Sequence, residues 1–249
     1  MEKDYYSIIL WKKAEREDIS FDEVVDNAMP IFEYLDTLPE TIKPRYTYVH
    51  KKAVPIILDR KTIETKMWNG CNKEDGKLII DFGYSFSLFS SIISDGNCEI
   101  SYKFRFGNTY NLIPNTIIID FRFNQIKAIL DINKSLICEM FESLIWLFKP
   151  YFGCIANRQP LNDSQKYIKS DGSKIPATLY GYNYWNEEML EKIGLDRIKS
   201  LEGKYHLHFE EPGFIKLFDG FIDINNEEQL KERKEIEDYL LYNDKIISK

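Results

Sequence analysis

A run of alternating side chains in the middle of the chain most constrains its fold. Over Cys98–Phe106, three aromatic rings alternate with the cations of Lys103 and Arg105. Successive side chains of a β-strand point to opposite faces, so this run predicts a strand that is buried on one face only. Gly83 separates the first two of the neighbouring strands, which are predicted at Lys77–Phe82, Ser85–Ile93 and Asn115–Phe123. The middle of the chain is therefore expected to form an antiparallel sheet.

Helices are predicted where apolar side chains recur every three or four residues. Ser20 and Glu23 have the spacing of a capping box, which predicts a helix over 21–38. Pro30 lies inside that segment and is expected to kink or split the helix. Two further helices are predicted at Asn133–Phe148 and Asn226–Leu241. The last of these is strongly charged and is expected to lie on the surface.

The remaining segments complete a single α+β domain over residues 1–249. The polar stretch Asn157–Lys174 reads as a long surface loop. Further strand-like segments are Tyr5–Trp11, Phe152–Ala156, Ile198–Leu201, Tyr205–Glu210 and Gly213–Leu217. The predicted architecture is a central antiparallel sheet with helices packed on one side of it.

Composition and charge exclude several classes of protein. Hydrophobic residues make up 44% of the 249 residues, enough for a substantial core. A formal charge of −7 argues against direct nucleic-acid binding, which relies on clustered lysine and arginine. The start of the chain does not resemble a secretory signal, and no apolar stretch reaches the length that crosses a bilayer. Four widely spaced cysteines indicate buried thiols, so we expect a cytoplasmic protein without a membrane partner.

The segment 176–194 combines aromatic rings with carboxylates. An extended aromatic stretch is followed by Asn186, which is expected to cap a short helix that ends at Gly194. In one interpretation the alternate rings pack in the core, while Asn183 or Asn186 holds the turn. In the other, exposed rings anchor a partner, because interfaces favour tyrosine and tryptophan. The adjacent acids would then attract a basic partner.

Catalytic chemistry is only weakly indicated. His206, His208 and Glu210 alternate along one predicted strand and share a face, so a metal site and an ordinary solvated strand face are both possible interpretations. The sequence contains no nucleophile elbow and no phosphate-binding glycine motif. We therefore expect a protein that is not an enzyme and has no cofactor or bound metal.

The order of several motifs resembles the immunity protein 52 family of bacterial polymorphic toxin systems. The motifs are the strand 5–11, the segments 82–89 and 114–119, the corner 180–185, the turn 210–212 and the terminal helix. The corner Gly181-Tyr182-Asn183-Tyr184-Trp185 departs from the family's usual Gly-Trp-hydrophobic-Thr-Tyr. The resemblance implies a cytoplasmic α+β protein that binds and neutralises a cognate toxin, often a nuclease, without catalysis.

The expected mechanism is binding through an acidic and aromatic surface. Carboxylates that mimic phosphate charge would steer a basic toxin towards the protein. The predicted contact residues are Tyr182, Tyr184, Trp185, Glu187, Glu188, Glu191, Glu210 and Glu211. Two alternatives remain: a binding or counter-defence protein that inhibits another macromolecule, and a metal-dependent hydrolase that uses His206, His208 and Glu210.

Overall fold

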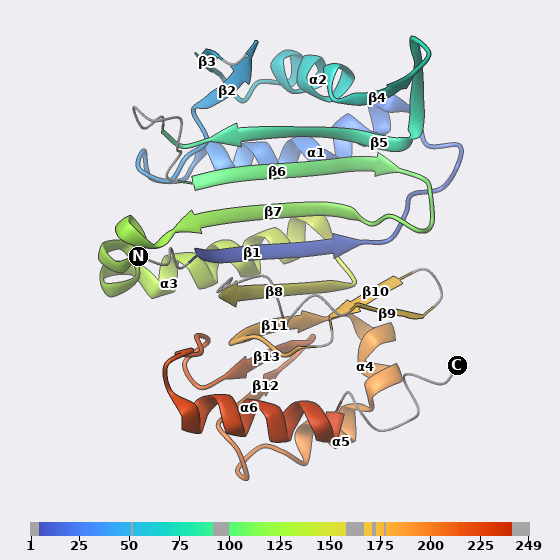
Figure 1. Ribbon diagram of the computed structural model, residues 1–249. Coiled ribbons are helices and arrows are strands. Elements are labelled where there is room, and N and C mark those ends of the chain that lie inside the picture. Colours follow the sequence, from blue (N-terminus) through green and yellow to red (C-terminus); the bar gives the residue numbers. More distant parts are fainter. Residues whose placement is uncertain are drawn as a thin grey trace.

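The computed structural model describes residues 5–50, 52–91, 100–157, 167–170, 173–176 and 178–240. Within these residues, eleven strands form one antiparallel sheet, in the order β12-β13-β11-β8-β1-β7-β6-β5-β2-β3, with β4 paired to β5 (Figure 1). Its strands are β1 (Tyr5–Lys12), β2 (Tyr46–Val49), β3 (Lys52–Pro55), β4 (Cys71–Glu74), β5 (Lys77–Phe89), β6 (Ile100–Asn108), β7 (Asn115–Arg122), β8 (Phe152–Asn157), β11 (Tyr182–Trp185), β12 (Leu207–Glu210) and β13 (Phe214–Leu217).

Helices flank this sheet, and a separate hairpin interrupts the predicted surface loop. The helices are α1 (Phe21–Asp36), α2 (Arg60–Asn69), α3 (Phe123–Phe148), α4 (Glu187–Ile193), α5 (Leu195–Lys199) and α6 (Glu227–Leu240). The hairpin consists of β9 (Tyr167–Ser170) and β10 (Ser173–Pro176), so the prediction of a long surface loop over Asn157–Lys174 was wrong at residues 167–170 and 173–174, which are strands. Residues 158–166 and 171–172 of that segment lie outside the described part of the chain.

The predicted alternation in β6 is confirmed. Tyr102, Phe104 and Phe106 are buried, whereas Lys103 is exposed. The strand pairs with β5 on one side and β7 on the other, both antiparallel. The period-two pattern therefore identified a central strand of the sheet correctly.

The sheet has a hydrophobic core on each face. Ile8 and Leu10 of β1 lie in a first core together with the apolar faces of α1 and α3. Trp11, one position further along the strand, lies in a second core together with α4, α5 and α6. Because adjacent side chains of a strand point to opposite faces, the two cores lie on opposite sides of the sheet. Figure 1 shows α1 and α3 behind the strands and α6 in front of them, so the expectation of helices on one side only was wrong.

Local chemistry explains where the elements differ from the predicted ones. Ser20 and Glu23 form the predicted capping box, and α1 runs unbroken past Pro30. The strand β5 continues through Gly83 instead of breaking there, because glycine accepts the positive φ of 71° that an L side chain rarely adopts. The segment that includes Ile198 is helical, not extended, since Ile198 and Leu201 enter the second core at helical spacing.

The helix α3 begins ten residues before the predicted start. Its first turns carry Gln125, Lys127 and Ala128, which are good helix formers, and the prediction had ended a strand at Phe123 instead. The later part of α3 packs against the sheet: a Cβ at Gly153 of β8 would lie 2.7 Å from Ile145 Cδ1 and 3.1 Å from Phe141 Cε2. The glycine thus permits close approach of helix and strand.

Candidate interaction surface

The aromatic corner is mostly a packing element. Tyr182 is fully buried in the first core, and Trp185 is only 1% exposed in the second. Tyr184 is half-buried, with its ring 5.2 Å from that of Phe214. Core packing, the first of the two interpretations, therefore describes Tyr182 and Trp185. Of the three predicted aromatic contact residues, Tyr184 retains accessible surface.

Two asparagines fix the geometry of the corner, as the sequence indicated. The buried Asn183 amide accepts the backbone N–H of Tyr180 at 3.0 Å and donates to the carbonyl oxygen of Tyr180 at 2.6 Å. Asn186 caps α4 by accepting the N–H of Met189 at 3.1 Å, and Gly194 ends that helix with a positive φ. The helix and its acids are thereby held at a defined position after β11.

The acids of α4 differ in their surroundings. Glu188 accepts hydrogen bonds from the ammonium groups of Lys13 and Lys192, and the bond from Lys13 is the main cause of its lowered pKa. Glu187 and Glu191 lie one helical turn apart, are exposed, and have no ion pair within the part of the chain that the structure describes. These two carboxylates are available to a partner.

The sheet brings the acids of the β12–β13 turn to the same end of the molecule as α4. The N–H of Trp185, at the end of β11, donates to the carbonyl oxygen of Gly213 at 3.0 Å. Glu187 follows this junction directly, and Glu210 and Glu211 precede it. The Glu211 carboxylate lies 3.5 Å from Lys199 Nζ, and both acids are exposed. Five of the eight predicted contact residues thus gather at one end of the sheet.

The three side chains considered as metal ligands, His206, His208 and Glu210, each lie near a different charged partner. The ring Nδ1 of His206 lies 3.0 Å from Glu232, and that of His208 lies 3.3 Å from Glu202. Glu210 instead faces Lys216 Nζ at 3.8 Å. No group of three or more histidine, cysteine or acidic side chains lies close enough to hold a metal ion among the described residues. The arrangement is that of a solvated strand face with local ion pairs.

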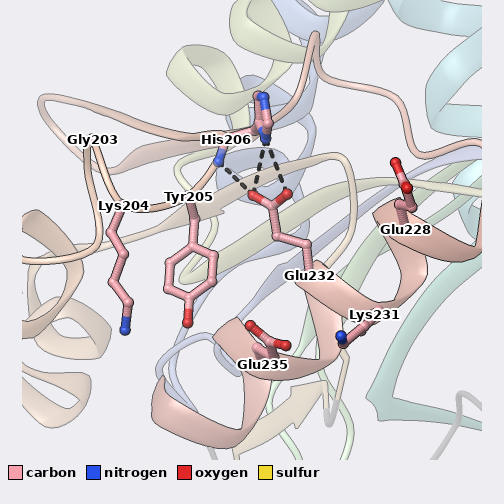
Figure 2. A pocket seen from close by; sticks show the side chains of 8 residues that line it. All are labelled: Gly203, Lys204, Tyr205, His206, Glu228, Lys231, Glu232 and Glu235. Atoms are coloured by element: carbon pink, nitrogen blue, oxygen red, sulfur yellow. Dashed lines mark hydrogen bonds and ion pairs between the residues drawn. The ribbon is translucent and has the colours of Figure 1, made fainter.

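A shallow depression of about 620 Å³ lies between the 203–206 turn and α6 (Figure 2). Glu232 extends from α6 and accepts a hydrogen bond from the backbone N–H of His206 at 2.5 Å. The His206 ring stacks on Phe218 at 5.5 Å. The other lining residues are Gly203, Lys204, Tyr205, Glu228, Lys231 and Glu235. The lining contains both lysine and glutamate side chains, so it has no single charge.

A polar cluster beneath the corner was missed by the sequence analysis. The hydroxyl of Tyr182 donates to Glu142 of α3, and Lys216 Nζ lies 4.6 Å from the centre of the Tyr182 ring. Burial is the main cause that raises the pKa of Tyr182, and the nearby Glu142 raises it further. The one signal in the sequence was the position of Glu142 and Lys216 within otherwise apolar segments.

The comparisons with known proteins concern the fold. The structure is that of an α+β protein built on one broad antiparallel sheet. Among its described residues, no helix is long and apolar enough to cross a membrane. No protein-family model and no curated protein sequence matches the chain. Among solved structures, it resembles the Pseudomonas aeruginosa T6SS protein PA0821, with a TM-score of 0.52 and 15% sequence identity. The match covers 99% of this chain and 77% of that chain, and at this identity it shows a shared fold.

Proposed function

We propose that this chain is a non-catalytic immunity protein that binds and neutralises a cognate bacterial toxin. The observation that carries the proposal is the similarity of fold to a T6SS protein over 99% of the chain. The resemblance of the motif order to the immunity protein 52 family supports it independently, because it rests on the sequence and not on the fold. A cytoplasmic location and a nuclease as the toxin are part of the same proposal.

The acidic end of the sheet supplies the recognition chemistry in this proposal. Glu187 and Glu191 present two carboxylates on one face of α4 that have no ion pair among the described residues. Glu211 is exposed in the β12–β13 turn at the same end of the sheet. Carboxylates that project from a rigid helix and a tight turn form a fixed negative patch. Such a patch attracts a basic partner over long distances and raises the association rate more than the final affinity.

The test of the function is protection from a toxin encoded beside this gene. The product of the adjacent open reading frame is expressed in a bacterial host with and without this chain, and growth is recorded. We expect growth arrest without the chain, rescue with it, and co-purification of the two products. An adjacent product that is harmless, or whose toxicity persists when the chain is present, would count against the immunity function.

Reversal of the two unpaired charges on α4 tests the surface. For the double variant Glu187→Lys/Glu191→Lys, we expect the association rate with the toxin to fall by about tenfold at low salt. The difference should shrink as salt is added, because screening weakens exposed charges. Stopped-flow fluorescence measures both effects.

The matched control is Glu33→Lys/Glu74→Lys, which changes the net charge equally at exposed sites on α1 and β4. If both double variants slow association to the same extent, the overall charge of the protein steers the partner and the α4 patch has no special role.

A further inference from the structure

An exposed tryptophan stands beside a part of the sheet that is partly open to solvent. Trp146 of α3 is 60% exposed, whereas the indoles of Trp11 and Trp185 are buried. On the face of β12 and β13 that looks towards α3, His208, Glu210 and Lys216 are exposed or half-buried. Their strand neighbours Leu207, Phe209, Ile215 and Leu217 are buried in the second core on the opposite face.

The packing of α3 determines where Trp146 points. Phe141 and Ile145 of α3 lie over Gly153 of β8. Glu142, the residue after Phe141, turns towards β11 and β13, because it accepts the Tyr182 hydroxyl and lies 3.6 Å from Lys216 Nζ. Trp146 is one helical turn beyond Glu142 and shares its face of the helix. It therefore lies towards β11 and β13 as well.

The strand register shows which sheet residues lie in the row that Trp146 faces. Gly153 pairs with Tyr184, and Tyr184 pairs with Phe214, which in turn pairs with Glu210. Four helical residues advance about 6 Å and two strand residues about 6.6 Å. The step from Glu142 to Trp146 on the helix therefore matches the step from Tyr182 to Tyr184 on β11. We call Glu142, Trp146, Tyr184, Glu210 and Lys216 the Trp146 surface.

The charges of the Trp146 surface leave its carboxylates only partly satisfied. One ammonium, that of Lys216, lies between two carboxylates, at 3.6 Å from Glu142 and 3.8 Å from Glu210. Both distances exceed those of charge-assisted hydrogen bonds, which are about 2.7–2.9 Å. Glu210 is exposed and has acceptor positions for a further cation. The surface thus combines an exposed indole, a half-buried phenol ring and an accessible carboxylate.

We propose that the Trp146 surface binds an arginine side chain presented by a basic segment of a partner protein. A guanidinium is planar, so it stacks on the indole of Trp146 while its N–H groups donate to Glu210. A lysine ammonium offers the charge without the flat face or the paired donors, so arginine is favoured. This inference deepens the proposed function and rests on it for the identity of the partner as a toxin.

The test uses a defined probe, so that it does not depend on the toxin. Fluorescein-labelled hexa-arginine and hexa-lysine peptides are titrated with the full chain, and anisotropy gives each dissociation constant. We expect hexa-arginine to bind about tenfold more tightly than hexa-lysine, with stacking on Trp146 as the source of the difference. In Trp146→Ala and in Glu210→Lys that preference should disappear. Tyr110→Ala, which removes an exposed ring elsewhere, is the control and should retain it.

The outcomes separate the site from the function. Equal affinity of the wild-type chain for the two peptides, or a preference that Trp146→Ala retains, would overturn the Trp146 surface. Thermal melting confirms that each variant is folded, which the exposure of Trp146 leads us to expect.

The same variants are then tested for binding to the adjacent gene product. If hexa-arginine is preferred and that product is not bound, the surface stands and the immunity function fails. If the product binds the wild type and Trp146→Ala equally, the immunity function stands and the role of the Trp146 surface in toxin recognition is overturned.

Discussion

Glu237 is a carboxylate in the interior of the second half of the molecule. It is 4% exposed on α6, and its Oε1 accepts the backbone N–H of Leu179 at 2.8 Å. Arg233 Nε lies 3.6 Å away. Burial is the main cause that raises the pKa of Glu237, and it outweighs the opposing effect of the Arg233 charge. This single side chain joins α6 to the segment that leads into β11.

The raised pKa of Glu237 makes a prediction about stability and pH. An acid whose pKa is higher in the folded state binds its proton more tightly there than in the unfolded chain. Its contribution to stability is therefore complete below the pKa of an unfolded glutamate, about 4.3, and is lost as the pH rises through the folded pKa. Glu237→Gln cannot ionise but can still accept the Leu179 N–H, so we expect it to gain stability relative to the wild type as the pH rises.

Urea unfolding of the two proteins between pH 4.5 and 8 measures the difference. Glu235→Gln, an exposed position on the same helix, serves as the control. A difference between wild type and Glu237→Gln that stays constant over this range would contradict the prediction.

At the scale of elements, the outer edge of β12 is protected by carboxylates. The backbone N–H of Phe209 donates to Glu202 Oε1 at 2.8 Å, and that of His206 donates to Glu232 Oε1 at 2.5 Å. Edge amides that lack such acceptors pair readily with the strand of another molecule. The two side chains come from different elements, the turn after α5 and the helix α6, and they bind an amide of β12 and the amide of the residue just before that strand.

Removal of both carboxylates should expose the β12 edge. We expect Glu202→Ala/Glu232→Ala to self-associate as its concentration rises, because its free amides can extend the sheet into a second copy. Size-exclusion chromatography with light scattering measures the mass. Glu228→Ala/Glu235→Ala removes the same charge from α6 and should remain unchanged. Identical mass profiles for the two double variants would show that the edge amides are not the reason for any association.

Elements with a regular pattern were predictable, and those whose pattern depends on tertiary packing were not. The alternation of β6 and the capping box of α1 are local, so the sequence identified both. The helical state of Ile198 is not local, because it follows from burial against strands distant in sequence. For the site, Glu187 and Glu191 are exposed, as residues predicted to contact a partner must be. The burial of both Tyr182 and Trp185 was not predictable from alternation, because it results from helices that cover both faces of β11.

At the scale of the whole molecule, one sheet serves two cores. The strand β1 contributes Ile8 to the first core and Trp11 to the second. The strand β11 does the same with Tyr182 and Trp185. Neither core has a sheet of its own. Disruption of one core would therefore disturb the strands against which the other core packs. This arrangement favours unfolding as a single unit, in line with the predicted single domain.

Substitution in one core should therefore be detected in the other. We expect Ile8→Ala to destabilise the chain by about 2–5 kcal/mol, the usual cost of deleting a buried isoleucine side chain. In a Trp68→Phe/Trp146→Phe background, the remaining fluorescence comes from Trp11 and Trp185 in the second core. The unfolding midpoint in urea should shift equally by circular dichroism and by this fluorescence. Ile215→Ala, in the second core, should give coincident curves as well. Separate transitions for the two probes would indicate two domains.

The alternation of β12 and β13 has a consequence for how such a protein changes over time. Leu207, Phe209, Ile215 and Leu217 anchor these strands to the second core, while His208, Glu210 and Lys216 project from the reverse side. A substitution at the exposed His208 or Glu210 leaves the packing of the second core intact. The specificity of a binding surface on this side can therefore change while the protein remains stably folded. Binding would depend on one set of alternate residues in these strands, and stability depends on the other set.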